Sequence, residues 1–204
     1  MGVGRGRLVS VARDLHRFFD LRVSLQDVEP AIWRTIRIPA DLTLPQLHKV
    51  LQVGMGWSNA HLHQYHAKGR MYGTPDSDFD TPVLSEVGVH LNDLLQRPGD
   101  RIIYEYDFGD DWLHEVCLAR VIENMASPRL ALCLEGSGKC PPEDCGGPPG
   151  FEEFLAALSN SRHPQHRRMR EWYGGAFDRD DFSVGEVNEQ LRRLRFPKKR
   201  ESLA

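Results

Sequence analysis

The segment 104–114, which reads YEYDFGDDWLH, constrains the fold of this chain more than any other. The residues on either side of its centre, 101–108 and 112–121, alternate in character as the residues of β-strands do. Gly109 and Asp110 suit a two-residue hairpin turn, because glycine readily adopts the positive φ that such a turn requires. The sequence therefore predicts an antiparallel hairpin with acids, aromatic residues and a histidine gathered at its end.

The register of this hairpin decides which side chains meet. A two-residue turn places Asp107 opposite Trp112 and Glu105 opposite His114, with all four side chains on one face of the sheet. A carboxylate beside an imidazole can bind a divalent metal or act as an acid–base pair. A cross-strand ion pair next to a packed tryptophan explains the same residues without any activity, and a longer loop would change the register.

Composition and charge narrow the class of protein. The 204 residues are 40% hydrophobic and 27% charged, with a net charge of -3, which is ordinary for a soluble globule. This charge gives no general attraction to nucleic acid or to an anionic membrane. No apolar run approaches the roughly 18 residues of a membrane helix, and the N-terminus lacks the apolar core of a secretory signal. We therefore expect a cytoplasmic protein with no membrane partner.

The rest of the chain divides into strands followed by helices. Two alternating runs, 21–28 and 32–38, predict a second hairpin broken at Pro30. Thr43 can cap a helix that ends near Gly56. Further predictions are a short strand at 61–66, a long surface loop at 73–87, a short helix at 89–95, a strand at 130–134 and helices at 151–158, 165–173 and 184–194.

This order of elements predicts an α+β fold, with a mainly antiparallel sheet built from hairpins, helices packed on it and a helical C-terminal third. A chain of this length fits one domain. We expect residues 1–20 to form a partly flexible N-terminal extension, 21–196 a single domain and 197–204 a basic tail.

Histidines supply the first candidate metal ligands. In a strand over 61–66, His61 and His63 share one face at a spacing that zinc and other transition metals can use. His114 and a carboxylate would complete a site of three protein ligands and a water, for a divalent cation such as zinc or manganese. Two half-exposed histidines on a sheet edge are the simpler interpretation.

A second polar cluster occupies residues 140–147, which read CPPEDCGG. The prolines stiffen this loop, and the glycines permit unusual dihedrals or a close backbone approach. Such a loop can aim Glu143 and Asp144 at a ligand, although Asp144 could equally cap a turn or the following helix. Cys140 and Cys145 have a spacing compatible with zinc, but no second Cys/His pair lies nearby.

Five unusual motifs follow one another along the chain. They are Pro30-x-Ile-Trp-Arg34, Leu44-x-x-Leu-His48 with Gln52, Gly56-Trp57 followed by His61-Leu-His63, Tyr104-x-Tyr-Asp-Phe-Gly-Asp110 with Trp112 and His114, and Pro141-Pro-Glu-Asp-x-Gly-Gly147. In these motifs the chain resembles the plasmid pRiA4b ORF-three-like family, over roughly residues 21–194. The resemblance implies a compact α+β domain of bacteria and archaea and brings no established activity. Some members are labelled as passenger proteins of insertion elements, with a resolvase-type name.

Two hypotheses follow, and the sequence leaves open whether the protein is an enzyme. In the first, a polar site that joins three segments binds a metal or small ligand, with metal-assisted hydrolysis as the most plausible reaction. Its candidate residues are His61, His63 and His114 as metal ligands, Asp107, Glu143 and His114 as catalytic groups, and Asp110, Trp112 and Asp144 as ligand-binding groups.

In the second hypothesis the protein is a non-catalytic accessory of a mobile element. The segment 192–200 holds six basic residues and no acid, so the basic C-terminal helix could bind DNA or a protein partner. The conspicuous acids and histidines would then serve mainly to satisfy buried polar groups.

Overall fold

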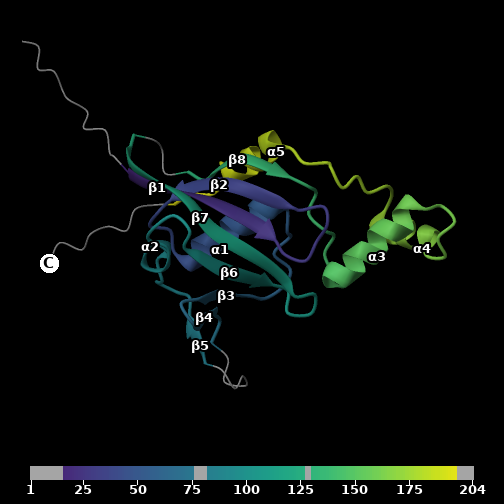
Figure 1. Ribbon diagram of the computed structural model, residues 1–204, viewed down its shortest axis with the longest axis horizontal. Coiled ribbons are helices and arrows are strands. Elements are labelled where there is room, and N and C mark those ends of the chain that lie inside the picture. Colours follow the sequence, from purple (N-terminus) through teal and green to yellow (C-terminus); the bar gives the residue numbers. More distant parts are fainter. Residues whose placement is uncertain (1–15, 76–81, 127–129, 197–204) are drawn as a thin grey trace, which may run out of the picture.

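The computed structural model describes residues 16–75, 82–126 and 130–196. Its strands form one eight-stranded sheet in the order β5-β4-β3-β6-β7-β1-β2-β8, in which only β4 and β5 run parallel to each other (Figure 1). The strands are β1 (His16–Leu25), β2 (Trp33–Pro39), β3 (His63–Ala67), β4 (Arg70–Gly73), β5 (Val83–Ser85), β6 (Arg101–Tyr106), β7 (Trp112–Met125) and β8 (Leu132–Ser137).

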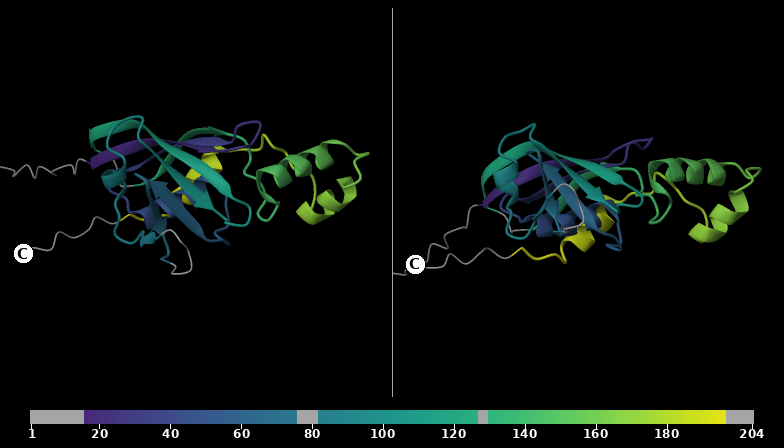
Figure 2. Two further views of the ribbon diagram at one scale, coloured as in Figure 1. Left: turned by 60° about the horizontal axis from the view of Figure 1, so that its bottom comes forward. Right: turned by 90° about the horizontal axis from the view of Figure 1, so that it is seen from below.

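The helices are short, and four of the five described ones lie in two places. Figure 2 shows α1 and α5 beneath one face of the sheet, while α3 and α4 form a lobe beyond one end of the strands. None of the helices within the described ranges has the length and apolar character needed to cross a membrane. Their bounds are α1 (Leu44–Met55), α2 (Leu91–Leu94), α3 (Gly147–Ser159), α4 (His166–Tyr173) and α5 (Val184–Leu191).

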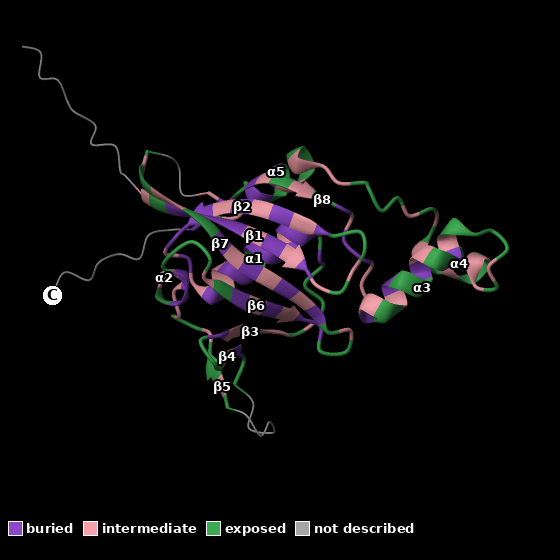
Figure 3. Ribbon diagram, viewed as in Figure 1, coloured by how far each residue is buried: buried purple, intermediate pink, exposed green. Residues whose placement is uncertain are grey.

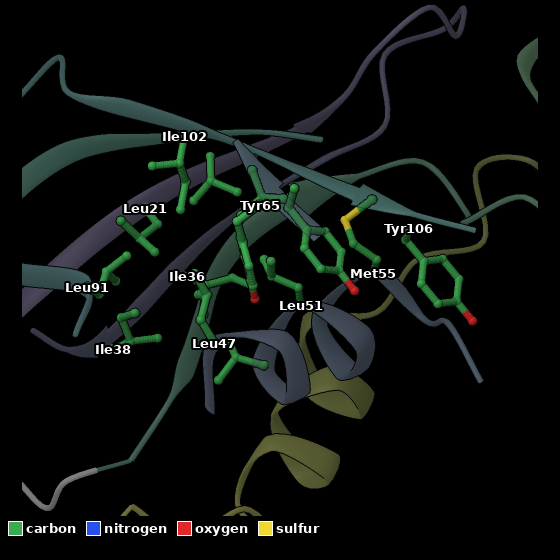
Figure 4. Close-up of a cluster of buried hydrophobic side chains, with 14 of the residues drawn as sticks. Leu21, Ile36, Ile38, Leu47, Leu51, Met55, Tyr65, Leu91, Ile102 and Tyr106 are labelled. Carbon is green, nitrogen blue, oxygen red and sulfur yellow. The ribbon is translucent and has the colours of Figure 1, made fainter. Parts of the chain in front are cut away.

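The core lies between α1 and the sheet. Leu47 and Leu51 of α1 point toward Ile36 and Tyr65 on the strands, and all four are at most 1% exposed (Figure 4). Buried and partly exposed residues alternate along the central strands, as Figure 3 shows, because successive side chains leave a strand on opposite faces. Burial of a large apolar side chain such as Leu47 or Ile36 contributes about 1.5–3 kcal/mol to the free energy of unfolding.

The helix α1 forms where the sequence predicts it. Thr43 precedes its first turn, and the backbone N–H of Thr43 donates to Oε1 of Gln46 at 2.9 Å. Gly56 ends the helix with φ at 108°, in the left-handed region where glycine pays no steric penalty. The chain that leaves α1 at Gly56 leads directly to the candidate site.

The register of the β6–β7 hairpin differs from the predicted one. Tyr104 lies opposite His114 and Tyr106 opposite Trp112, so residues 107–111 form the loop. The predicted two-residue turn, and with it the Asp107–Trp112 and Glu105–His114 pairs, is therefore wrong. The cause is Asp107, which adopts a φ of 61° and whose Oδ1 accepts hydrogen bonds from the backbone of Gly109 and Asp110, so that it closes the loop early.

The predicted helical C-terminal third is also wrong. The strand β8 enters this part of the chain, and the three helices that follow are separated by non-helical residues 160–165 and 174–183. Gly174, with φ at 87°, ends α4 after two turns. The fold is thus mostly an antiparallel sheet with short helices.

The N-terminal boundary of the sheet lies before the expected one. The strand β1 starts at His16, and Phe18 and Phe19 are buried, so residues 16–20 belong to the sheet. Residues 1–15 and 197–204, which hold most of the expected N-terminal extension and the whole basic tail, lie outside the described residues.

Arg34 of β2 joins the sheet to two other segments. It is 1% exposed, and its guanidinium donates to the carbonyls of Gly54 at 2.9 Å, Ser137 at 2.7 Å and Gly138 at 2.9 Å. None of the residues that the structure describes offers it a carboxylate. Its charge also suits the C-terminal end of α1, where backbone carbonyls give a negative field. Arg34 therefore ties the end of α1 and the turn after β8 to one point on the sheet.

Replacement of Arg34 by alanine should lower the free energy of unfolding by about 3–5 kcal/mol, because several buried carbonyls lose their donor and a cavity opens. The matched control is Arg101→Ala, which removes an exposed ion pair to Glu115 at 2.9 Å and should cost under about 1 kcal/mol. Urea denaturation of both variants measures the difference. Similar midpoints for the two variants would contradict the role assigned to Arg34.

Candidate metal centre

Three segments meet at the end of the sheet nearest to α3. His61 lies in the loop between α1 and β3, Asp107 begins the β6–β7 loop, and Glu143 lies in the loop between β8 and α3. Figure 1 shows the β6–β7 loop reaching toward the start of α3. Nε2 of His61 is 3.5 Å from Oδ2 of Asp107 and 3.7 Å from Oε2 of Glu143. The fold therefore brings one imidazole and two carboxylates together.

These separations match those between ligands of a metal ion. Two ligand atoms that each lie about 2.1 Å from a tetrahedral zinc ion are about 3.4 Å apart. The three candidate ligand atoms all lie within 4.8 Å of one another.

Glu143 is held by one of its two carboxylate oxygens. Its Oε1 accepts hydrogen bonds from the backbone N–H of Ser58 at 2.7 Å, from the Ser58 hydroxyl at 2.8 Å and from the Tyr106 hydroxyl at 3.1 Å. Its Oε2 is buried and receives no hydrogen bond from the described residues. Burial, assisted by the charge of Glu143, raises the pKa of Tyr106 to about 12, so the phenol remains a donor.

The two carboxylate oxygens of Asp107 also have different partners. Oδ1 accepts hydrogen bonds from the backbone N–H groups of Gly109 at 3.0 Å and Asp110 at 3.4 Å, while Oδ2 faces His61. Only 6% of Asp107 is exposed. Both carboxylates are thus oriented by donors behind them and present one oxygen each toward the same imidazole nitrogen.

His61 completes the cluster. Its ring stands edge-on to Tyr106, with centroids 5.8 Å apart, and its Nε2 is buried without a hydrogen bond of acceptable geometry to any described residue. Oδ1 of Asp144 lies 3.2 Å from this nitrogen. The side chain of Asp144 is 73% exposed, so it marks the solvent side of the cluster.

The β6–β7 loop is fixed against the loop that holds Glu143. Oδ2 of Asp110 accepts a hydrogen bond from the backbone N–H of Gly146 at 3.1 Å. Gly147 has a φ of 67°, and a Cβ there would lie 2.3 Å from the carbonyl oxygen of Asp110. Glycine is therefore required for the two loops to approach, and this approach sets the distance between the carboxylates.

His114 lies outside the cluster, although it was a candidate metal ligand and catalytic group. It is fully buried; its Nδ1 lies 3.2 and 3.1 Å from the carbonyl oxygens of Tyr104 and Trp112, and its Nε2 lies 3.1 Å from the indole Nε1 of Trp57. Because carbonyls only accept and an indole only donates, Nδ1 bears the proton. Burial lowers the pKa of His114 to about 4. This geometry leaves no nitrogen of His114 for a cation.

The other predicted site residues are also distributed differently. The strand β3 begins at His63, so His61 and His63 do not share a strand face. His63 lies 3.1 Å from Glu86 and stacks on His48 with ring centroids 3.7 Å apart. Trp112 is fully buried, with its ring centroid 5.5 Å from that of Trp57, and does not face solvent.

The groups that orient Glu143 are not marked by any single motif. Ser58 follows the Gly56-Trp57 pair and Tyr106 precedes Asp107, but only the fold places their hydroxyls at one carboxylate oxygen.

The cysteines are free, and burial raises the pKa of Cys145 to about 12, which disfavours its thiolate form as a ligand.

The predicted basic C-terminal helix ends at Leu191, before its arginines, of which Arg192, Arg193 and Arg195 are described and exposed. The helix α5 contains no lysine or arginine, and Asn188 hydrogen-bonds the backbone of Cys133 in β8 at 2.7 and 2.8 Å. The arginines that follow α5 lead into residues 197–204, which are outside the described part of the chain. DNA binding and an association with a mobile element stay predictions.

Comparison with known proteins places this chain in a family. A model of the plasmid pRiA4b ORF-3-like proteins matches residues 17–186. The chain belongs to that family. The ORF-3-like chain is 37% identical over 173 residues to the uncharacterized protein y4hQ of Sinorhizobium fredii, a match that covers 84% of this chain and 89% of the relative. A crystal structure of a protein of unknown function from Methanosarcina mazei Go1 is similar, with a TM-score of 0.75 and 30% identity, over 85% of this chain and 99% of that one.

Acid should destabilise this ORF-3-like protein through His114. The unfolded chain takes up a proton near pH 6.5, but the folded state resists protonation until a pKa of about 4, so stability falls as pH decreases through this window. The loss amounts to about 3 kcal/mol by pH 4. In urea denaturation at pH 7 and pH 4 with chelator present, His114→Asn should lose about that much less than the wild type. An equal loss in both proteins would contradict a buried neutral His114.

Proposed function

We propose that His61, Asp107 and Glu143 bind one divalent cation, zinc or manganese, and that this centre hydrolyses a polar bond. One observation supports the proposal above all. Each carboxylate has one oxygen fixed by donors behind it and directs the other toward Nε2 of His61, which has no hydrogen-bond partner among the described residues. Metal centres use such outer hydrogen bonds to orient their ligands.

Electrostatics favours a cation at this point. Two carboxylates close together at a largely buried position repel each other and lose hydration. Within the described ranges, no lysine or arginine forms an ion pair with Asp107, Glu143 or Asp144, and the basic group near all three is the imidazole of His61. A divalent cation would compensate both charges and would use the lone pair of a neutral imidazole.

The donor set also limits which cation fits. One imidazole nitrogen and two carboxylate oxygens suit zinc and manganese better than thiolate-seeking copper(I) or oxygen-only calcium. Three protein ligands leave a coordination position for water or substrate, which is the pattern of catalytic zinc sites rather than structural ones. The near-tetrahedral separations of His61 from both carboxylate oxygens favour zinc of the two.

The chemistry of such a centre is hydrolysis. A bound divalent cation polarises a carbonyl or phosphoryl oxygen and lowers the pKa of coordinated water. Asp144 is the group placed to accept the proton of an attacking water, because its carboxylate is exposed and lies 3.2 Å from the ligand nitrogen of His61. Asp107 and Glu143, which the sequence offered as candidate catalytic groups, are better suited to hold the ion.

Purified protein loaded with zinc or manganese should retain one ion per chain after dialysis, as measured by elemental analysis and calorimetry. His61→Ala and Glu143→Gln should weaken the binding by at least about 100-fold, since loss of an outer-shell partner alone costs 10–100-fold. Ser58→Ala removes such a partner and should fall in that lower range.

The matched control is His66→Ala, which removes an imidazole paired with Glu105 at 2.8 Å on β3 and should leave binding unchanged. At a free metal concentration of about 100 times the Kd, wild-type protein should gain about 2.7 kcal/mol of stability. Absence of retained metal in the wild type, or equal retention by His61→Ala, would refute the site.

Asp144→Asn should separate metal binding from turnover. Metal affinity should change by less than about threefold, whereas kcat with 4-nitrophenyl acetate or bis(4-nitrophenyl) phosphate should fall by about 10²–10⁴-fold, as for loss of a general base. Asp111→Asn is the control, because it removes an exposed charge from the neighbouring loop. Equal kcat values for these two variants would rule out Asp144 as the base.

A further inference from the structure

A hollow of about 220 Å³ lies between the loop that holds Asp144 and the two helices of the lobe. It borders the metal centre, because Asp144 both lines this hollow and lies 3.2 Å from Nε2 of His61. The hollow is smaller than the roughly 300–1,000 Å³ that encloses a whole drug-sized ligand, so it suits one ring-sized group. Its lining residues are Asp144, Cys145, Phe154, Arg168, Met169 and Trp172.

The apolar wall of the hollow is firmly packed. Phe154 is 1% exposed and meets Trp172, Tyr173 and Phe177 in edge-on contacts with centroids 5.3–5.7 Å apart. Trp172 is nevertheless 48% exposed, and its ring contact with this cluster is the one to Phe154. A half-exposed indole beside a hollow offers a flat surface for an apolar or aromatic group.

Arg168 supplies the charge. It lines the hollow from α4, and within the described ranges its guanidinium has no ion pair or hydrogen bond. Its neighbour Arg167 differs, since it pairs with Glu171 at 3.5 Å one turn along the same helix. A guanidinium presents donors in a planar fork that matches the oxygens of a carboxylate or phosphate.

We propose that this hollow is the substrate subsite of the metal centre and that it takes a ring-bearing organic oxyanion. The ring packs on Trp172 and Met169, the carboxylate or phosphate pairs with Arg168, and the bond to be hydrolysed extends past Asp144 toward His61. This inference rests on the proposed hydrolytic function and defines the chemical class of its substrate.

The test uses small probes in place of the substrate. Benzoate and phenyl phosphate carry both a ring and an oxyanion, benzyl alcohol has the ring without the charge, and acetate and inorganic phosphate have the charge without the ring. Titrations are followed by the indole N–H signal of Trp172 in two-dimensional NMR, assigned with Trp172→Phe. A saturable shift with benzoate or phenyl phosphate, at least about tenfold tighter than with the incomplete probes, is the expected result. Whichever of the two binds more tightly identifies the anion as carboxylate or phosphate.

Two arginine variants decide the role of the charge. Arg168→Ala should weaken probe binding by about 10–100-fold, because a charge-assisted hydrogen bond is lost. Arg167→Ala removes the same charge from the adjacent position and should bind like the wild type. Equal binding by these two variants, or the absence of any saturable shift in the wild type, would overturn the subsite.

Metal-free protein keeps this test separate from the test of the metal centre. The subsite uses residues outside the ligand set, so His61→Ala in the presence of chelator should bind benzoate within about threefold of the wild type. Probe binding without metal uptake would therefore refute the metal centre alone. Metal uptake without probe binding would refute the subsite alone.

Discussion

The buried guanidinium of Arg34 is the interaction on which the rest of the structure depends. It links β2 to the last turn of α1 and to the turn that follows β8, through carbonyls of Gly54, Ser137 and Gly138. The chain leaving the first of these points reaches Ser58 and His61, and the chain leaving the second reaches Glu143. One side chain on the sheet thus anchors both loops that meet at the candidate centre. Because all its partners are neutral carbonyls, this link needs no buried carboxylate and leaves the acids of the chain available elsewhere.

The third segment of the site depends on the β6–β7 hairpin. Its position is set by pairing with the neighbouring strands and by the contact between Asp110 and Gly146. His114 contributes from beneath: a neutral, fully buried imidazole holds the indole of Trp57 against the sheet at 3.1 Å. The residue after Trp57 is Ser58, whose backbone and hydroxyl orient Glu143. A conspicuous histidine therefore serves the site through position and not through its own chemistry.

The sequence predicted which segments of the chain come together at the candidate site better than it predicted which side chains form the cluster. The helical spacing of apolar residues and the glycine that ends it were sufficient to predict α1. The alternation of apolar and polar residues was sufficient to predict the strands of the main hairpins. Both signals come from residues that are close in the sequence. The density of polar residues indicated the three segments that the fold brings together. This density could not show which of His61, His63 and His114 would lie in the cluster, because that depends on where β3 begins and on the register of β7. A loop three residues longer than predicted changed the partner of His114 from Glu105 to Tyr104, and such a shift reverses which side chains share a face. The three helices after β8 lie close to their predicted ranges, but the connections between them, 160–165 and 174–183, leave much of the C-terminal third non-helical, so describing that third as helical was wrong.

The central claim is that the fold assembles His61, Asp107 and Glu143 into a single cation site. Anomalous diffraction from crystals grown with zinc, recorded on both sides of the zinc absorption edge, tests it most directly. The predicted result is one dominant peak about 2.0–2.2 Å from Nε2 of His61, Oδ2 of Asp107 and Oε2 of Glu143. A dominant peak at another position, such as between His63 and Glu86, or no peak at the cluster in zinc-saturated crystals, would contradict it.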